Sequence, residues 1–225
     1  ILLSRDKIAA TQVMAECGLP VPKTIRVASM NDCMYALRAI GSYPLVIKAS
    51  EGTQGSSVFL IDDQARAISL LSQMFERGMR PLVQEYIEES HGRDIRVIVV
   101  RGRVVASMVR KARGSEFRSN FHLGGSVEAV TLTSDQANVA IKAADGLGLD
   151  VAGVDMLESA SGPLLLEANS SPGLEGIERA TGVNVAARIV SSLRARVREA
   201  SDTGEDMRNA LEKDAKNLGH AAESD

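Results

Sequence analysis

The sequence contains no tryptophan and only 3% aromatic residues, so its core must be built from aliphatic side chains. The same scarcity argues against a surface on which the bases of single-stranded nucleic acid stack. The cysteines, Cys17 and Cys33, and the three histidines are too few for a disulfide framework and make a zinc site improbable. Free cysteines are typical of a reducing compartment, so we expect a cytoplasmic protein. No apolar run approaches the ~18 residues of a membrane span, and we expect neither a membrane partner nor a secretory signal.

The sequence also lacks a large excess of charge of either sign, because 26 basic and 29 acidic residues leave a net charge of −3. The acidic excess lies in residues 199–225, which hold 8 acidic and 3 basic residues. The remainder is only mildly basic, so we expect no nucleic-acid partner. The polar segment 199–225 is predicted to be disordered or a marginal helix.

Hydrophobic periodicity and turn residues predict a mixture of helices and strands. The predicted helices run over 6–16, capped by Asp6, and over 31–40, 63–77, 134–147, capped by Ser134, and 184–198. The predicted strands cover 44–48, 58–61, 82–87, 151–157 and 163–169, with a hairpin over 94–112 that turns at Arg101-Gly102. This order predicts an α+β fold of two lobes that meet near residues 80–90.

One group of polar residues stands at the ends of two neighbouring predicted strands. Glu167 and Asn169 are two residues apart and therefore face the same side of a strand, and a hairpin brings Asp155 beside them. Three oxygen ligands without sulfur or imidazole suit Mg²⁺ or Mn²⁺. The alternative is an ordinary solvated strand face. Against it, Glu167 directly follows three leucines that should be buried, where a carboxylate needs a partner.

Three further features permit both a functional and a structural interpretation. Lys48 ends an apolar strand and precedes the small polar loop 51–56, which is either a phosphate cradle or a plain hairpin loop. A basic run is either a clamp for phosphate or carboxylate groups or a solvated loop; it comprises Arg110, Lys111, Arg113 and Arg118. His91 and His122 have no evident triad partner, which favours surface histidines over acid–base groups.

Taken together, these residues resemble the ATP-grasp ligases, and specifically the RimK family of glutamate ligases. The resemblance runs from Ser4 to about Arg198. Its blocks are Ser4-Arg5-Asp6-Lys7, Val46-Ile47-Lys48, Glu51-Gly52-Thr53-Gln54-Gly55, Val83-Gln84-Glu85-Tyr86-Ile87, Asp94-Ile95-Arg96, Phe117-Arg118-Ser119-Asn120, Ala152-Gly153-Val154-Asp155 and the segment from Glu167 to Gly176. It implies an ATP-grasp N-terminal lobe over 1–84, a C-terminal lobe with the metal site over 85–198, and an acidic tail over 199–225.

The resemblance also implies a role for each matching residue. Lys7 and Lys48 would contact the ATP phosphates under a lid that contains Gln54 and Gly55. The strand backbone at Glu85 and Tyr86 would hold the adenine, and Asp94 would bind the ribose. The remaining positions form two sets: Arg118, Ser119 and Asn120 near the γ-phosphate, and Asp155, Glu167 and Asn169 on two Mg²⁺ or Mn²⁺ ions, with Arg118 and Asn169 as catalytic residues.

The implied reaction joins an amine to a carboxylate through an acylphosphate, at the cost of ATP. In the family the amine is typically glutamate and the acceptor is the C-terminal carboxylate of a protein or peptide, and homo-oligomers occur. Family members usually carry a further domain before the Ser4 block, whereas only three residues precede it here. Leu123 also stands where an arginine is expected. We therefore keep two alternatives: a ligase that joins another amino acid to a small metabolite or carrier protein, and a non-catalytic nucleotide-binding module.

Overall fold

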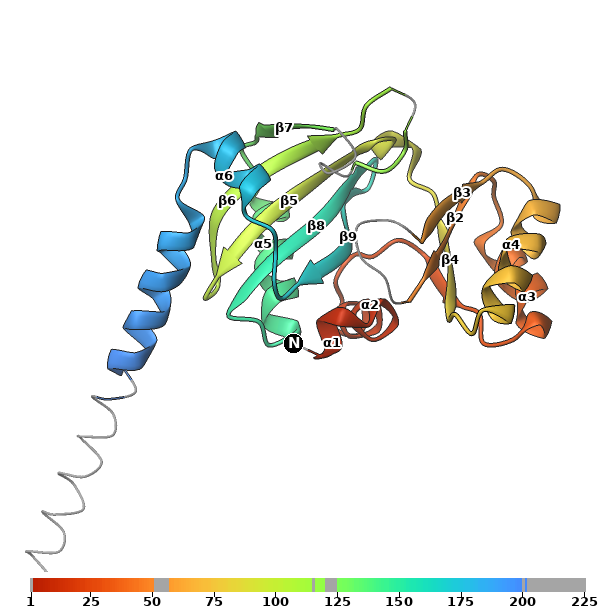
Figure 1. Ribbon diagram of the computed structural model, residues 1–225, viewed down its shortest axis with the longest axis horizontal. Coiled ribbons are helices and arrows are strands. Elements are labelled where there is room, and N and C mark those ends of the chain that lie inside the picture. The colour runs from red at the N-terminus through yellow and green to blue at the C-terminus, as the bar shows by residue number, and fades with distance from the viewer. Residues whose placement is uncertain (1, 51–56, 115, 120–124, 200, 202–225) are drawn as a thin grey trace, which may run out of the picture. The chain divides into compact units, whose positions relative to one another are not determined.

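Within the residues that the computed structural model describes (2–50, 57–114, 116–119, 125–199 and 201), the first unit, Ile1–Val185, contains two antiparallel sheets (Figure 1). The first sheet has the strand order β1-β4-β2-β3 and the second the order β7-β6-β5-β8-β9. Helices accompany both sheets, so the α+β class predicted from the sequence is confirmed.

The first sheet is built from four short strands covered on one face by two helices (Figure 1). The strands are β1 (Thr24–Arg26), β2 (Leu45–Ala49), β3 (Val58–Ile61) and β4 (Pro81–Glu85), and the helices are α3 (Met30–Ile40) and α4 (Gln64–Glu76). Leu45, Ile47 and Val83 are fully buried in a hydrophobic cluster with these helices. Because side chains alternate along a strand, Lys48 lies on the opposite face of β2.

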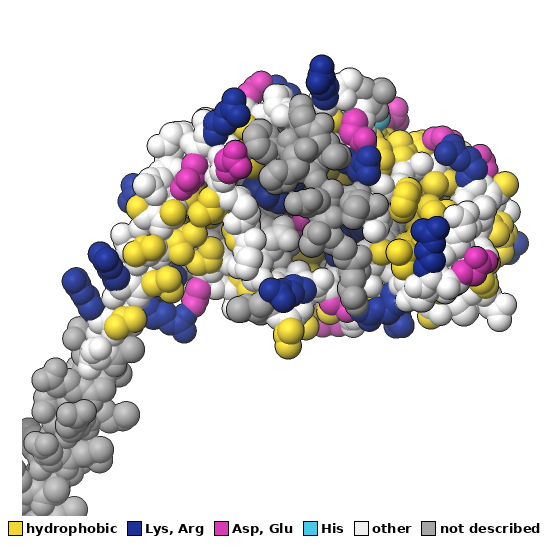
Figure 2. All heavy atoms as spheres, viewed as in Figure 1, with side chains coloured by type: hydrophobic (Ala, Val, Ile, Leu, Met, Phe, Trp, Pro, Cys, Tyr) yellow, Lys and Arg dark blue, Asp and Glu magenta, His cyan; other side chains and the backbone are white. Residues whose placement is uncertain are grey.

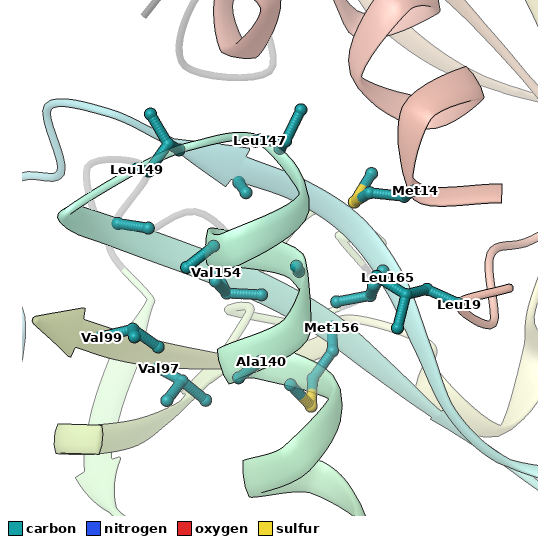
Figure 3. Close-up of a cluster of buried hydrophobic side chains, with 14 of the residues drawn as sticks. Met14, Leu19, Val97, Val99, Ala140, Leu147, Leu149, Val154, Met156 and Leu165 are labelled. Carbon is teal, nitrogen blue, oxygen red and sulfur yellow. The ribbon is translucent and has the colours of Figure 1, made fainter. Parts of the chain in front are cut away.

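The second sheet carries helix α5 (Ser134–Gly146) on one face (Figure 3). Its strands are β5 (Arg93–Val100), β6 (Arg103–Lys111), β7 (Ser126–Ala129), β8 (Val151–Ser159) and β9 (Gly162–Asn169). Val97, Val154 and Met156 are fully buried beneath α5. The alternate positions of β5 and β8, including Arg96 and Asp155, therefore face the other side of the sheet.

The amino-terminal helices pack with this second sheet. Helix α1 (Leu2–Arg5) and helix α2 (Lys7–Glu16) contact β9, and α2 also contacts α5. Met14 and Leu19 belong to the same buried cluster as Leu165 (Figure 3). The core of the second sheet thus includes a helix that the sequence resemblance assigns to the lobe 1–84, and the proposed lobe boundaries stay predictions.

Most of the predicted elements are confirmed, with shifts of one or two residues at their ends. Asp6 accepts hydrogen bonds from the Ile8 and Ala9 amides, as expected of the cap of α2. The predicted cap Ser134 is wrong: Thr133 caps α5 in a capping box with Gln136, whose side chain accepts from the Thr133 amide. A threonine three residues before a glutamine is the signature of this motif. Short elements were not predicted, namely α1, β1, β7, the 3₁₀ turn Glu88–Ser90 and α6 (Glu175–Thr181).

The second unit, Ala186–Asp225, is described only in its first part. A helix over 185–199 corresponds to the predicted helix 184–198, and Val190, Leu193 and Val197 are exposed on it. The predicted tail falls almost entirely outside the described residues. None of the described helices is long and apolar enough to cross a membrane. Basic and acidic side chains are interspersed over the described part of the face in Figure 2.

A close approach of two chain segments makes a stability prediction at Gly153 in β8. A methyl group there would lie 2.5 Å from the Cβ of Pro172, in the turn after β9. We expect Gly153→Ala to lower the free energy of unfolding by about 1–3 kcal/mol, because either β8 or the turn must shift. Urea denaturation measures this. Gly173→Ala is the matched control, because, apart from its chain neighbours, no described residue has an atom within 4 Å of its Cβ position. Equal stability of both variants would contradict the prediction.

Candidate functional site

Charged side chains line the face of the second sheet opposite α5. Asp94 of β5 lies directly across from Arg110 of β6, and Arg96 of β5 lies across from Asp155 of β8. Since Asp94 and Arg96 are two residues apart, all four side chains emerge on one face. The strand order β6-β5-β8 thus brings two arginines and two aspartates together.

These four side chains form one network of charge-assisted hydrogen bonds. Arg96 donates from Nε to Asp155 Oδ1 at 2.7 Å and from Nη2 to Asp155 Oδ2 at 2.6 Å. Arg110 donates to Asp94 through Nε at 2.6 Å and Nη2 at 2.5 Å. The same Nη2 lies 2.8 Å from Asp155 Oδ2, so Arg110 bridges the two aspartates. Such bidentate pairs fix both the position and the plane of each carboxylate.

The network determines the protonation of its members. Burial opposes ionisation of Asp155, but Arg110 and Arg96 outweigh it and hold the pKa of this carboxyl at about 2. Burial raises the pKa of Asp94, as does the charge of Asp155, against the opposing effect of Arg110. The paired aspartates keep the pKa of Arg110 above its usual range despite burial of the guanidinium.

An acid-stability prediction follows from Asp155. Its folded pKa of about 2 lies below an unfolded value of about 3.9, so its contribution to stability is complete above pH 4. This contribution, on the order of 2 kcal/mol, is lost as the pH falls from about 4 to 2. We expect Asp155→Asn to lack this part of the acid loss and Asp135→Asn, on the exposed start of α5, to retain it. Chemical denaturation at pH 5 and pH 3 measures the free energy of unfolding of the wild type and of both variants. An equal loss between these pH values in all three proteins would contradict the prediction.

The remaining predicted metal ligands lie on β9 beside Asp155. Glu167 is directly across from Asp155, and Asn169 is across from Gly153, so all three residues share one face. Asn169 Nδ2 donates to Glu167 Oε1 at 3.0 Å. The sequence prediction that a hairpin brings these three residues side by side is therefore confirmed at the level of strand register.

This donor set is compatible with a hard divalent cation. Within the part of the chain that the structure describes, no three His, Cys, Asp or Glu side chains lie close enough together to hold a metal. The candidate set contains only two carboxylates, of Asp155 and Glu167, and its third member is the amide of Asn169. Asp155 Oδ2 accepts two hydrogen bonds, from Arg96 and Arg110, whereas Oδ1 accepts one. Since a carboxylate oxygen offers two lone pairs, Oδ1 retains one for a metal. The all-oxygen chemistry suits Mg²⁺ or Mn²⁺.

Lys48 approaches this carboxylate group from the first sheet. Its ammonium is buried, and Nζ donates to Gln84 Oε1 at 3.0 Å. Burial lowers the pKa of Lys48 to about 8; the charge of Glu167 raises it and that of Lys7 lowers it. Lys7 begins α2, and its amide donates to the Ser50 carbonyl oxygen at 3.2 Å. The structure thus brings the two predicted phosphate-binding lysines within electrostatic range of each other and places Lys48 near Glu167.

The predicted adenine-binding strand has other local contacts. The Glu85 amide donates to the Lys23 carbonyl oxygen at 2.9 Å, and Glu85 Oε1 accepts from the Lys23 amide at 2.6 Å. The Tyr86 hydroxyl is hydrogen-bonded to His91 Nδ1, and the two rings stack edge to face. His91 is therefore an exposed partner of Tyr86, and the adenine role stays a prediction.

The segment after β6 holds other residues that are predicted to contact phosphate. Arg118 pairs with Glu116 through Nε at 2.9 Å and Nη2 at 2.8 Å, and its guanidinium lies over the Phe117 ring. The hydrogen bonds from Arg118 lower the pKa of Glu116 to about 2. Ser119 is buried and hydrogen-bonded to Asp94. Other predicted positions lie outside the described residues: Gln54, Gly55, Asn120, His122 and Leu123.

Comparison with known families decides the relationship. The RimK-like ATP-grasp domain matches residues 4–193. This chain belongs to that family. The RimK-like domain is 46% identical over 190 residues to a probable alpha-L-glutamate ligase of Aeromonas salmonicida (strain A449), covering 84% of this chain and 64% of the relative. It therefore spans less than two thirds of that curated relative.

Solved structures show the same fold at lower identity. D-cycloserine synthetase DcsG matches with a TM-score of 0.71 and 23% identity over 87% of this chain and 71% of its own. The ATP-grasp ligase PsnB, solved with a phosphomimetic precursor variant, Mg and ADP, matches with a TM-score of 0.66 and 19% identity over 86% and 59%. These likenesses confirm the predicted ATP-grasp fold.

Sequence reasoning missed the connecting role of the arginines in this RimK-like domain. The sequence indicates Arg110 only as part of a basic run and Arg96 only as part of a motif. The spacing of Asp94 and Arg96 by two residues is a local signal that both share a strand face. Asp155, the partner of Arg96, is 59 positions away from it in the sequence, so the ion network depends on a strand pairing that local patterns do not specify.

Proposed function

We propose that this RimK-like domain catalyses an ATP-dependent ligation that forms an amide between the amino group of glutamate and an acceptor carboxylate. The curated relative of 46% identity carries the name of a glutamate ligase, which supports the choice of amino acid. We propose the C-terminal carboxylate of a protein or peptide as the acceptor. A cytoplasmic location is supported by the free thiols of Cys17 and Cys33.

The observation that carries this proposal is the buried ammonium of Lys48, which lies within electrostatic range of Glu167, the residue across from Asp155. A buried ammonium beside Glu167 provides a positive group for phosphate oxygens, while Glu167 and Asp155 provide oxygen ligands for a cation. Nucleotide phosphates with a bound divalent cation require both kinds of group. A module that only binds a protein partner has no need to bury Lys48 and Asp155.

Each predicted residue receives a role in this proposal. Lys48 and Lys7 bind phosphate oxygens, and Gln54-Gly55 covers them. The backbone at Glu85, the last residue of β4, and at Tyr86, just after it, holds the base, and Asp94 binds the ribose. The rest form two sets: Arg118, Ser119 and Asn120 at the γ-phosphate, and Asp155, Glu167 and Asn169 as ligands of two Mg²⁺ ions. Bound Mg²⁺ would neutralise charge on the phosphates.

The proposed chemistry has two balanced steps. A carboxylate oxygen of the acceptor attacks the γ-phosphorus of ATP, the bond to the β-phosphate oxygen breaks, and ADP leaves. The amine of glutamate then attacks the acyl carbon, phosphate leaves with its bonding electron pair, and the amine loses a proton as the amide forms. Arg118 donates hydrogen bonds to the negative charge that develops, which a fixed cation does effectively in a closed site. No covalent bond to the protein is needed.

The experiment measures ADP release with each amino acid in the presence of an acceptor peptide and Mg²⁺. We expect release to require both substrates and to be strongest with glutamate. A strong preference for another amino acid would replace glutamate in the proposal. ADP binding without turnover, over all amino acids and acceptors tried, would favour a nucleotide-binding module.

A further inference from the structure

The two arginines on the sheet face have unequal sets of partners. Both hydrogen bonds that Arg96 makes among the described residues go to Asp155. Arg110 makes two to Asp94 and one to Asp155. If the Asp155 carboxylate is engaged by another group, Arg110 keeps its bidentate partner Asp94, whereas Arg96 loses the carboxylate that balances its charge.

The burial of this pair makes such a loss costly. The side chain of Arg96 is 15% exposed and that of Asp155 is 3% exposed. A buried guanidinium without a hydrogen-bonded anion carries a large desolvation penalty. A cation at the free lone pair of Asp155 Oδ1 would share this carboxylate with the guanidinium of Arg96, whose positive charge opposes it. A guanidinium that moves away from the cation needs another anion.

We propose that Arg96 suppresses metal binding at Asp155 in the nucleotide-free protein, so that the metal site becomes fully available only when an anionic phosphate group can take over the guanidinium. Arg96 is then a positioning residue that couples metal affinity to nucleotide affinity through Asp155. The inference rests on the proposed function for the identity of the metal site. It assigns to Arg96 a task that the other site residues do not perform, because Arg110 remains anchored on Asp94.

The test is calorimetric titration of nucleotide-free protein with Mn²⁺. Removal of the competing guanidinium in Arg96→Met is expected to strengthen Mn²⁺ binding by a factor within the usual range of coupling, about 5- to 150-fold. Arg93→Met is the matched control, because Arg93 lies on the same strand but pairs with the exposed Glu158 at 3.2 Å. It removes the same charge and is expected to change the affinity much less. Equal or weaker Mn²⁺ binding by folded Arg96→Met, relative to the wild type, would overturn the proposal.

A second variant tests the proposal in case Arg96→Met does not fold. Arg96→Lys keeps the charge but cannot form the bidentate pair, so we expect tighter Mn²⁺ binding than in the wild type, by a smaller factor. Wild-type affinity in this variant would count against the inference. ADP binding to the wild type is measured separately. Its absence would refute the proposed function, whereas the nucleotide-free Mn²⁺ comparison between variants reports on Arg96 alone.

Discussion

Replacement of Glu167 by glutamine is expected to lower the rate of the proposed amide formation by about 10²- to 10⁴-fold. Metal ions supply several kcal/mol of charge stabilisation to phosphoryl transfer, and each 1.36 kcal/mol corresponds to a factor of ten. Glutamine keeps the size of the side chain and accepts the hydrogen bond from Asn169, so the strand register across from Asp155 should persist. What is lost is one of the two negative charges in the proposed ligand set.

The control for this variant is Glu128→Gln. Glu128 lies on β7, where it forms an exposed ion pair with Lys111 at 2.7 Å. Such surface pairs contribute little to stability, so this variant should resemble the wild type. A second readout is the titration of Lys48: because Glu167 raises the pKa of that ammonium, Glu167→Gln should lower it further. Wild-type turnover by a folded Glu167→Gln would remove Glu167 from the catalytic proposal.

The parts of this fold that the sequence predicts are those determined by neighbouring residues. The turn at Arg101-Gly102 has both residues in the left-handed region, with φ of 46° and 69°, and joins β5 to β6 as the sequence indicates. The hairpin that pairs Asp155 with Glu167 is likewise a local structure. Periodicity together with turn and capping residues is enough for both.

The parts that escaped prediction depend on long-range pairing. Strand β5 pairs with β8, which brings Arg96 to Asp155, and α2 packs Met14 against the core of the second sheet. Many strand orders are compatible with the same local pattern, since each alternation only decides which face a side chain occupies. The resemblance to a family names Asp94 and Asp155 as candidate site residues, but it does not indicate that two arginines hold them in one network.

The pH dependence of nucleotide binding is the second large expected effect, and it depends on Lys48. With a pKa of about 8 in the free protein, Lys48 is increasingly neutral above that pH. A bound phosphate group favours the ammonium, so binding of ADP should be accompanied by proton uptake near pH 8, and the affinity should fall as the pH rises from 7 to 10. Calorimetry in buffers of different ionisation enthalpy measures both quantities.

Substitution of Lys48 should remove the pH dependence of ADP binding and much of the affinity for ADP. A hydrogen bond to a charged group contributes about 1.5–3 kcal/mol, so Lys48→Met is expected to bind ADP roughly 10- to 100-fold more weakly at pH 7. Its proton uptake should disappear, whereas Lys142→Met, on the exposed side of α5, should behave as the wild type. An ADP affinity of the wild type that is constant between pH 7 and 10 would contradict the role of Lys48.

The same group predicts the opposite trend for the stability of the free protein. The folded pKa of about 8 lies below an unfolded value of about 10.4, so the unfolded chain binds more protons between these two pH values. The contribution of Lys48 to the free energy of unfolding therefore rises with pH over this window, and Lys48→Met should lack that rise. As the pH rises, nucleotide affinity should therefore fall while the stability of the free protein rises. These opposite trends would show that burial of the Lys48 ammonium lowers the stability of the free protein and that bound phosphate favours the charged form.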